Sequence, residues 1–327
     1  MRKVRTLSLA VVFLAAFALP ALAAPTGHFE RTLKVSGQVN LEITSGSGNV
    51  TVHTGAADTV QVSAKLHGNN GTSWLFGSGD VEERIHKIEQ NPPIEQTGNS
   101  IHIGSRGDHE LYRNISIDYD VTVPAQTQLT SRTGSGDQTI TGVALPLNAQ
   151  TGSGNVTVDN LGAEARVSSG SGDIKIGSVK GTLTASAGSG NIRAQGVAGE
   201  INAHTGSGDV EMRQVSAGNV KVDTGSGNIR LHGIKGGLHA QAGSGDIVAE
   251  GEPTSDWKLG AGSGSITLKV PSQASFNIDA RTSSGSLKVN HPVTMQGSFA
   301  RNHVQGKVGN GGPLVDVHTG SGDIQVD

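Results

Sequence analysis

The sequence predicts an all-β protein that folds as a parallel β-solenoid, similar to a β-helix, with rungs of about 18 residues. Two observations predict this class. The tetrad Gly-Ser-Gly-Asn/Asp returns at nearly constant spacing, and each interval holds two short stretches in which apolar and polar residues alternate. The regular tetrads begin, in steps of 18, 18, 18, 18, 19 and 18 residues, at Gly134, Gly152, Gly170, Gly188, Gly206, Gly225 and Gly243.

Each repeat is expected to contribute two strands. Directly after a tetrad, apolar residues stand at the first and third positions around a mostly polar residue, as in Ile174-Lys175-Ile176. This alternation predicts a strand with one buried face. A second apolar pair, such as Leu183 and Ala185, precedes the next tetrad. Because each strand returns in the same direction one repeat later, it should pair in parallel with its own copy, about 4.8 Å away.

The tetrad is expected to form the corner between the two strands. Glycine adopts positive φ without strain and lets neighbouring backbones approach closely. The fourth position alternates in the order Asp137, Asn155, Asp173, Asn191, Asp209, Asn228, Asp246, Ser265. If these residues stack, an unbroken aspartate row would cost about 1 kcal/mol per neighbouring pair in water, and interleaved asparagines relieve that repulsion. A row of calcium ions held by the column is the alternative.

Residues 1–23 are predicted to be a signal peptide. Three basic residues lie within the first five positions, an apolar run follows from Leu7 to Leu19, and Ala21-Leu22-Ala23 provides the cleavage site. We therefore expect an exported product that is periplasmic, on the cell surface or secreted, with no membrane span after cleavage. A retained membrane anchor is the alternative. The sequence contains no cysteine, so disulfides do not support the fold.

Residues 24–132 are expected to form an N-terminal cap and opening rungs, with a loop and helix insertion near residues 68–93. Alternating strands flank an early tetrad at 46–49, and the pattern then breaks. Apolar residues at helical spacing predict a short helix from Asp80 to Glu89, which ends before two prolines. The cluster Trp74-Leu75-Phe76 is expected to close the open end of the solenoid; a ligand platform is the alternative. Strands are expected at 101–103 and 115–123.

Residues 133–327 are expected to form the regular β-solenoid repeats, with looser rungs toward the C-terminus. The period weakens after the tetrad at 262–265, and Met295 to Pro313 is interpreted as an insertion that protrudes as a hairpin. A regular tetrad returns at 320–323 and leads into a last strand. An uncapped rung ending at Asp327 would offer a free edge to a second copy. The sequence leaves the oligomeric state open.

From Phe29 to Asp327 the chain resembles a family of exported bacterial β-strand-repeat proteins that is adhesin-like and has no defined activity. The features that carry this resemblance are the leader, the stretch Asp118-Tyr119-Asp120-Val121-Thr122-Val123-Pro124, the repeated tetrads and the final rung at 320–324. The resemblance implies a β-helix-like solenoid outside the cytoplasm. It implies no catalytic residues, because the family has no accepted catalytic motif.

Composition and motifs exclude several function classes. The net charge is −3 and no block of like charge occurs, which argues against nucleic acid as a partner. The glycine-rich tetrads lack the Lys-Ser/Thr pair of a phosphate-binding loop. Neither a Gly-x-Ser-x-Gly elbow nor a His-Glu-x-x-His pair is present.

Two groups of residues are candidate sites. Neighbouring repeats contain His204, His232 and His239, which could hold a metal or could simply face solvent. One outward column contains Lys175, Arg193, Glu211 and Arg230, which could belong to a polysaccharide lyase or hydrolase or to an ordinary solvated strand face. For both groups we prefer the interpretation that the side chains are solvent-exposed strand residues without a catalytic or metal-binding role. We predict no catalytic, cofactor-binding or metal-ligating residues, and no cofactor.

The sequence therefore favours a non-enzymatic exported β-solenoid, an adhesin or a cell-envelope scaffold that presents a repetitive polar surface. A cell-envelope glycan or protein is the expected partner. The alternative is a polysaccharide-active β-helix enzyme with its cleft beside residues 68–79 or 295–313. A third hypothesis is an envelope sensor that acts through a partner protein.

Overall fold

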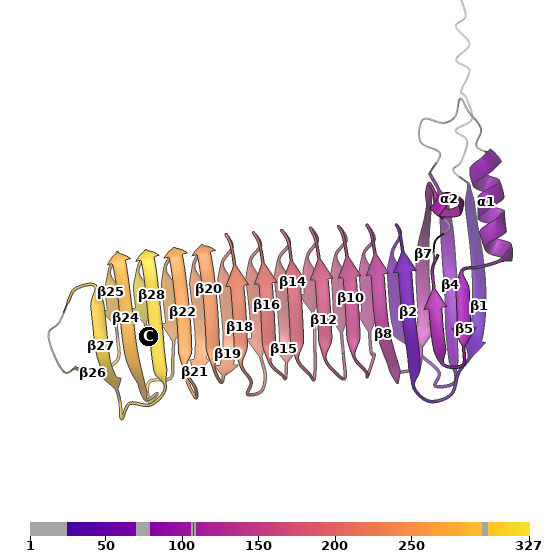
Figure 1. Ribbon diagram of the computed structural model, residues 1–327. Helices are drawn as coiled ribbons and strands as arrows, with labels where there is room; N and C mark the ends of the chain where they lie inside the picture. The colour runs from indigo at the N-terminus through magenta and orange to yellow at the C-terminus, as the bar shows by residue number, and fades with distance from the viewer. Residues whose placement is uncertain (1–24, 70–78, 106, 108, 296–299) are drawn as a thin grey trace, which may run out of the picture.

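The computed structural model describes residues 25–69, 79–105, 107, 109–295 and 300–327. Within these residues the chain is a linear stack of rungs made of two largely parallel sheets, which confirms the predicted β-solenoid (Figure 1). The predicted leader and the Trp74-Leu75-Phe76 cluster lie outside the described residues. Each regular rung contributes one strand to each sheet, so a rung has two faces.

Sheet A contains 14 strands. In spatial order they are β1 (Thr26–Lys34), β4 (Thr59–Gly68), β7 (Ile115–Val123), β3 (Val50–Thr54), β9 (Gln138–Thr141), β11 (Val156–Asp159), β13 (Ile174–Ile176), β15 (Ile192–Val197), β17 (Val210–Gln214), β19 (Ile229–Lys235), β21 (Ile247–Glu252), β23 (Ile266–Lys269), β29 (Ile324–Val326) and β25 (Leu287–Val289).

Sheet B contains 15 strands. In spatial order they are β5 (Ile94–Thr97), β6 (Ser100–Ile103), β2 (Val39–Ser45), β8 (Thr127–Thr133), β10 (Leu147–Thr151), β12 (Ala165–Ser169), β14 (Leu183–Ala187), β16 (Ile201–Thr205), β18 (Val220–Thr224), β20 (Leu238–Ser244), β22 (Trp257–Ser263), β28 (Leu314–Ser321), β24 (Phe276–Ser284), β27 (His303–Val308) and β26 (Val293–Thr294). The helices are α1 (Gly79–Gln90) and α2 (His109–Tyr112).

The core is a thin layer between the sheets, built from the apolar members of each alternating pair. In the sheet A strands, Ile174 and Ile176 are at most 3% exposed, and in the facing sheet B strands Leu183 and Ala185 are at most 1% exposed. The repeats pair in register, for example Ile174 with Ile192 and Leu183 with Ile201. Each buried side chain therefore stacks on its counterpart one rung away, and stability is the sum of such rung-to-rung contacts.

Close approach of backbones explains the glycines of the regular corners. A Cβ built on Gly170 would lie 2.3 Å from the carbonyl oxygen of Gly152, and one on Gly172 would lie 2.0 Å from that of Gly154. Neither glycine has a left-handed φ. The freedom to adopt positive φ, the other expected reason, therefore does not apply at these two positions.

At the N-terminal end of the stack, α1 packs on β1 and β4, the two outermost strands of sheet A (Figure 1). Its apolar residues Val81, Ile85 and Ile88 are buried, which confirms the predicted helix. Sheet A ends here in antiparallel β1 and β4. Arg84 is 9% exposed and donates to the carbonyl oxygens of Glu110 and Arg113, so it ties α1 to α2.

The C-terminal end differs from the prediction in two ways. The last rung, β28 and β29, is not an uncapped edge: β28 lies between β22 and β24, and β29 lies between β23 and β25 (Figure 1). The expectation of a free edge at Asp327 was wrong, because the chain returns and inserts its final rung into the stack. The described part of the 295–313 insertion does not protrude; β27 pairs antiparallel with β24 and extends sheet B.

Candidate functional site

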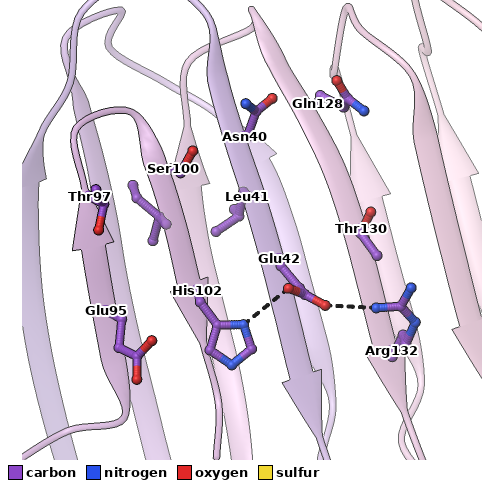
Figure 2. A pocket seen from close by; sticks show the side chains of 11 residues that line it. Asn40, Leu41, Glu42, Glu95, Thr97, Ser100, His102, Gln128, Thr130 and Arg132 are labelled. Carbon is purple, nitrogen blue, oxygen red and sulfur yellow. Dashed lines mark hydrogen bonds and ion pairs between the residues drawn. The ribbon is translucent and has the colours of Figure 1, made fainter. Parts of the chain in front are cut away.

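A recess with a polar cluster lies on the outer face of sheet B, where β5, β6, β2 and β8 run side by side (Figure 2). Its volume is about 420 Å³. Outward-facing residues of the four strands line it because alternation sends every second side chain away from the core. These residues are Asn40, Glu42, Glu95, Thr97, Ser100, His102, Gln128, Thr130 and Arg132.

Glu42 is the centre of this recess. One carboxylate oxygen lies 2.8 Å from Nη1 of Arg132, and the other lies 3.4 Å from Nδ1 of His102 (Figure 2). Parallel pairing of β2 with β6 places Glu42 directly beside His102. The His102 side chain is 8% exposed, and its Nε2 lies 3.1 Å from the carbonyl oxygen of Gly104. Arg132 therefore holds one oxygen of this carboxylate, and the other oxygen lies beside the His102 ring.

Gly104 fixes the position of that carbonyl. Its φ is +119°, and a Cβ here would lie 1.9 Å from the carbonyl oxygen of Thr44. Only glycine permits this approach of β6 to β2. The sequence predicted the strand that contains His102 but gave no sign that Glu42, His102 and Arg132 meet, because they come from three strands far apart in the chain.

The recess continues as a groove along sheet B. A second hollow of about 270 Å³ shares Gln128 and Thr130 with the first, and a third of about 510 Å³ shares Thr182 and Thr184 with the second. The third reaches Lys258 on β22. Three adjoining hollows thus form one shallow groove from β5 to β22, which runs across the strands and parallel to the stack.

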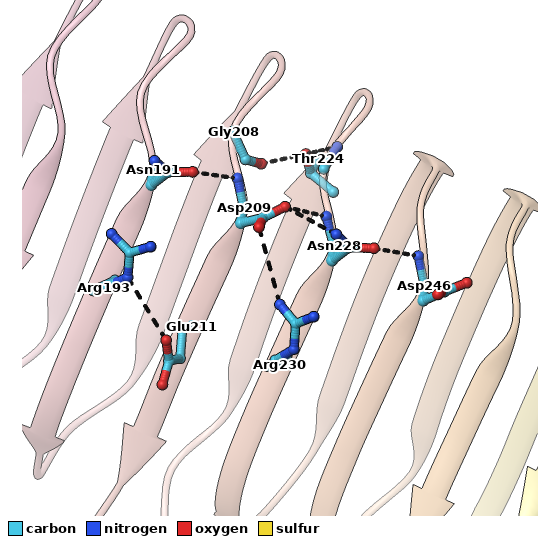
Figure 3. Close-up of polar contacts among 10 residues, drawn as sticks. Asn191, Arg193, Gly208, Asp209, Glu211, Thr224, Asn228, Arg230 and Asp246 are labelled. Atoms are coloured by element: carbon cyan, nitrogen blue, oxygen red, sulfur yellow. Dashed lines mark hydrogen bonds and ion pairs between the residues drawn. The ribbon is translucent and has the colours of Figure 1, made fainter.

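The corner column forms a continuous hydrogen-bonded ladder (Figure 3). In each step a side-chain oxygen accepts the backbone N–H of the next column residue, at 2.7 to 3.3 Å. The asparagine Nδ2 groups of three steps also donate to the preceding aspartate. In spatial order the ladder is Asp118, Asn49, Asp137, Asn155, Asp173, Asn191, Asp209, Asn228, Asp246, Ser265, Asp323, Ser286.

Acid and non-acid residues alternate along this whole ladder, including its ends. Two residues of the inserted segments keep the alternation: Asp118 lies in β7, and Asp323 directly precedes β29. Carboxylates are therefore about two strand spacings apart, which reduces their mutual repulsion. This is the electrostatic relief that the sequence predicted. Within the described residues, no three His, Asp or Glu side chains are grouped so that they could hold a metal ion.

The structure separates the three candidate histidines but brings the four charged candidate residues into one column. His232 lies on sheet A, 3.1 Å from Glu250, whereas His204 and His239 lie on sheet B, so the structure does not bring the three together. The second set does form one outward column on sheet A, since Lys175, Arg193, Glu211 and Arg230 pair in sequence. Arg193 and Glu211 approach to 3.7 Å (Figure 3). Both side chains are half exposed, which fits a solvated strand face.

Among the residues that the structure describes, no helix is long and apolar enough to cross a membrane.

The two-sheet stack and its polar outer faces define a repetitive β-solenoid. Models of the Toastrack DUF4097 family match residues 38–198 and 166–327, so the chain belongs to this family. No protein in the curated comparison matches the chain.

Solved structures show similar chains at low identity. A proposed lipid-binding protein from Parabacteroides distasonis is 13% identical over 92% of this chain and 96% of its own, with a TM-score of 0.40. A proposed adhesin from Bacteroides fragilis is 12% identical over 92% and 97%, with a TM-score of 0.29. A proposed cell adhesion protein from Clostridium sporogenes is 14% identical over 92% and 99%, with a TM-score of 0.18.

Proposed function

We propose that this chain is an exported, non-enzymatic adhesin or cell-envelope scaffold whose outer sheet faces bind an envelope component. One observation carries the proposal. The outward residues of both sheets form columns that continue from rung to rung, so polar side chains of varied type recur along the stack. Such a surface suits many weak contacts with an extended partner better than one reaction at one place.

The N-terminal sequence supports export, and residues 24–132 act in this proposal as the cap on which the regular repeats of 133–327 are built. Glu42 in the main recess already pairs with the Arg132 guanidinium, which favours a binding role for this carboxylate. The proposal assigns no cofactor and no resident metal.

The test is a binding and mass-balance experiment on the chain without residues 1–23. The immobilised protein is incubated with envelope extract and with a polysaccharide panel, in calcium and in chelator, and both the retained and the remaining material are measured. We expect retention without loss of any polymer, and no dependence on calcium. Consumption of one polysaccharide would overturn the proposal in favour of an enzyme.

A further inference from the structure

We propose that the groove on the outer face of sheet B binds a neutral, hydroxyl-rich polysaccharide that lies across the strands. This inference rests on the proposed adhesive function and names its ligand class. The groove runs from β5 to β22 through three hollows with shared walls. It is therefore long, shallow and continuous, which matches an extended polymer rather than a compact small molecule.

The charges that line the groove are balanced. Its five carboxylates are accompanied by four Lys or Arg side chains and two histidines. The carboxylates are Glu42, Glu95, Glu164, Glu200 and Asp256, and the cations are Arg132, Arg166, Lys221 and Lys258. A polyanion laid along this groove would meet five like charges and four opposite ones, so charge complementarity favours a neutral polymer.

Two outward columns of mostly polar residues run along the groove. One column includes Glu164, Thr182, Glu200, Asn219 and Asp256. The other, two residues further along each strand, includes Asn148, Arg166, Thr184, Asn202, Lys221, His239 and Lys258. A ligand that lies across the strands thus meets both donors and acceptors along its length. Sugar hydroxyl groups donate and accept hydrogen bonds at once, and they match such a mixed polar surface.

A peptide fits this groove poorly. The lining strands from β6 to β22 are paired on both sides, so no free backbone edge is available for an added strand. The apolar residues of these strands, such as Leu183 and Ile201, are buried in the core and form no pockets for peptide side chains. Phenylalanine, tyrosine and tryptophan are absent from the residues that line the three hollows.

The repeat distance supports the same ligand. Neighbouring strands are about 4.8 Å apart, which is about the length of one pyranose unit in an extended chain. Each further sugar can therefore meet the polar groups of the next rung. Contacts of this kind are individually weak and add along the polymer, so affinity should rise with the length of the oligosaccharide.

The experiment blocks the groove at its midpoint. Thr184 faces outward where the second and third hollows join, and Thr184→Trp would divide the groove. Val215→Trp is the control, because Val215 is 56% exposed and follows β17, outside the outer faces of both sheets. Both variants and the unchanged protein, without residues 1–23, are titrated with soluble neutral glucan, mannan, xylan and galactan, with their oligosaccharide series, and with polygalacturonate.

We expect at least one neutral polymer to bind, with affinity that grows with length and changes little with salt. Thr184→Trp should weaken this binding about tenfold or more, as expected when one long set of contacts is split into two short ones, and Val215→Trp should leave it unchanged. If Thr184→Trp does not fold, Asn202→Trp blocks the third hollow in its place.

Three results would overturn the inference: binding of none of the neutral polymers, equal binding by the blocked protein and the control, or salt-sensitive preference for polygalacturonate. Failure here is distinguishable from failure of the proposed function. If the blocked protein still retains envelope material, the adhesive function stands and the groove is not its site. If the unchanged protein retains nothing, both proposals fall.

Discussion

Replacing Gly170 by alanine should destabilise the solenoid strongly, because this corner has no room for a methyl group. An ideal Cβ would lie 2.3 Å from the carbonyl oxygen of Gly152. Contact at an ordinary distance requires a shift of about 1 Å between two corners that parallel pairing of β10 with β12 holds together. Overpacking of this kind costs about 1 to 3 kcal/mol, and the backbone that must move here favours the upper end.

Gly46→Ala is a matched control in the same protein. Gly46 is the first glycine of its own tetrad, as Gly170 is, but nothing lies within 4 Å of the Cβ that alanine would add. We expect this variant to stay within about 0.5 kcal/mol of the unchanged protein. Urea unfolding followed by circular dichroism gives both differences. Equal destabilisation by the two variants would refute close approach as the reason for the tetrad glycines.

Three further predictions concern the ladder, the buried residues that end the sheet B strands, and the N-terminal cap. Asn191→Asp creates three consecutive ladder carboxylates and should cost about 2 kcal/mol at low salt, about 1 for each neighbour; a urea midpoint loss that high salt does not reduce would contradict this. Ala187→Ser restores a buried hydroxyl of the kind that Thr205 uses to bridge its own corner and the preceding one, and should add about 1 kcal/mol; an unchanged midpoint would count against it. The backbone N–H of His28 donates to Glu89 at 2.8 Å, which lowers the pKa of that carboxyl below its usual 4.5. Because the folded pKa is the lower one, the stabilisation is complete above pH 4.5 and is lost as the pH falls through the folded value. The hydrogen-exchange rates of the α1 backbone amides in the unchanged protein and in Glu89→Gln should therefore become equal in acid. A difference in these rates that persists at all pH values would contradict the role given to the Glu89 carboxylate.

The regular repeats could be predicted from the sequence because two separate constraints recur there with the same period. Ile174 must face the core by alternation, and Asp173 must form the corner by its place after glycine. Both constraints repeat every 18 or 19 residues, so the pairing register follows directly. The short helix was also predictable, since its apolar spacing stands between a glycine-rich stretch and two prolines.

The order of rungs at the ends could not be predicted from periodicity alone. Periodicity implies that consecutive repeats are neighbours, whereas β7 and the last rung return over long connections and insert beside earlier strands. The ladder did contain a usable signal. Ser265 and Ser286 would be two successive non-acid residues if rungs stacked in sequence order, and placing Asp323 between them restores the alternation.

The main recess could not be predicted from the sequence either. Glu42, His102 and Arg132 lie outside the regular repeats, and their meeting depends on β6 pairing with β2. A single sequence offers no periodic mark of that pairing. The separation of His232 from His204 and His239 has a simpler cause, because residues before and after a tetrad belong to different sheets.

The central claim is that binding is distributed along the repeats, and an internal deletion tests it most directly. Removal of residues 170–205 takes out two rungs and joins Ser169 to Gly206, which preserves the alternation because Asp209 then follows Asn155 in the ladder. We predict a folded protein that still binds the material retained by the full chain, with clearly lower affinity because the surface is shorter. Undiminished affinity in the folded deletion would place the binding site at an end of the stack and contradict the account.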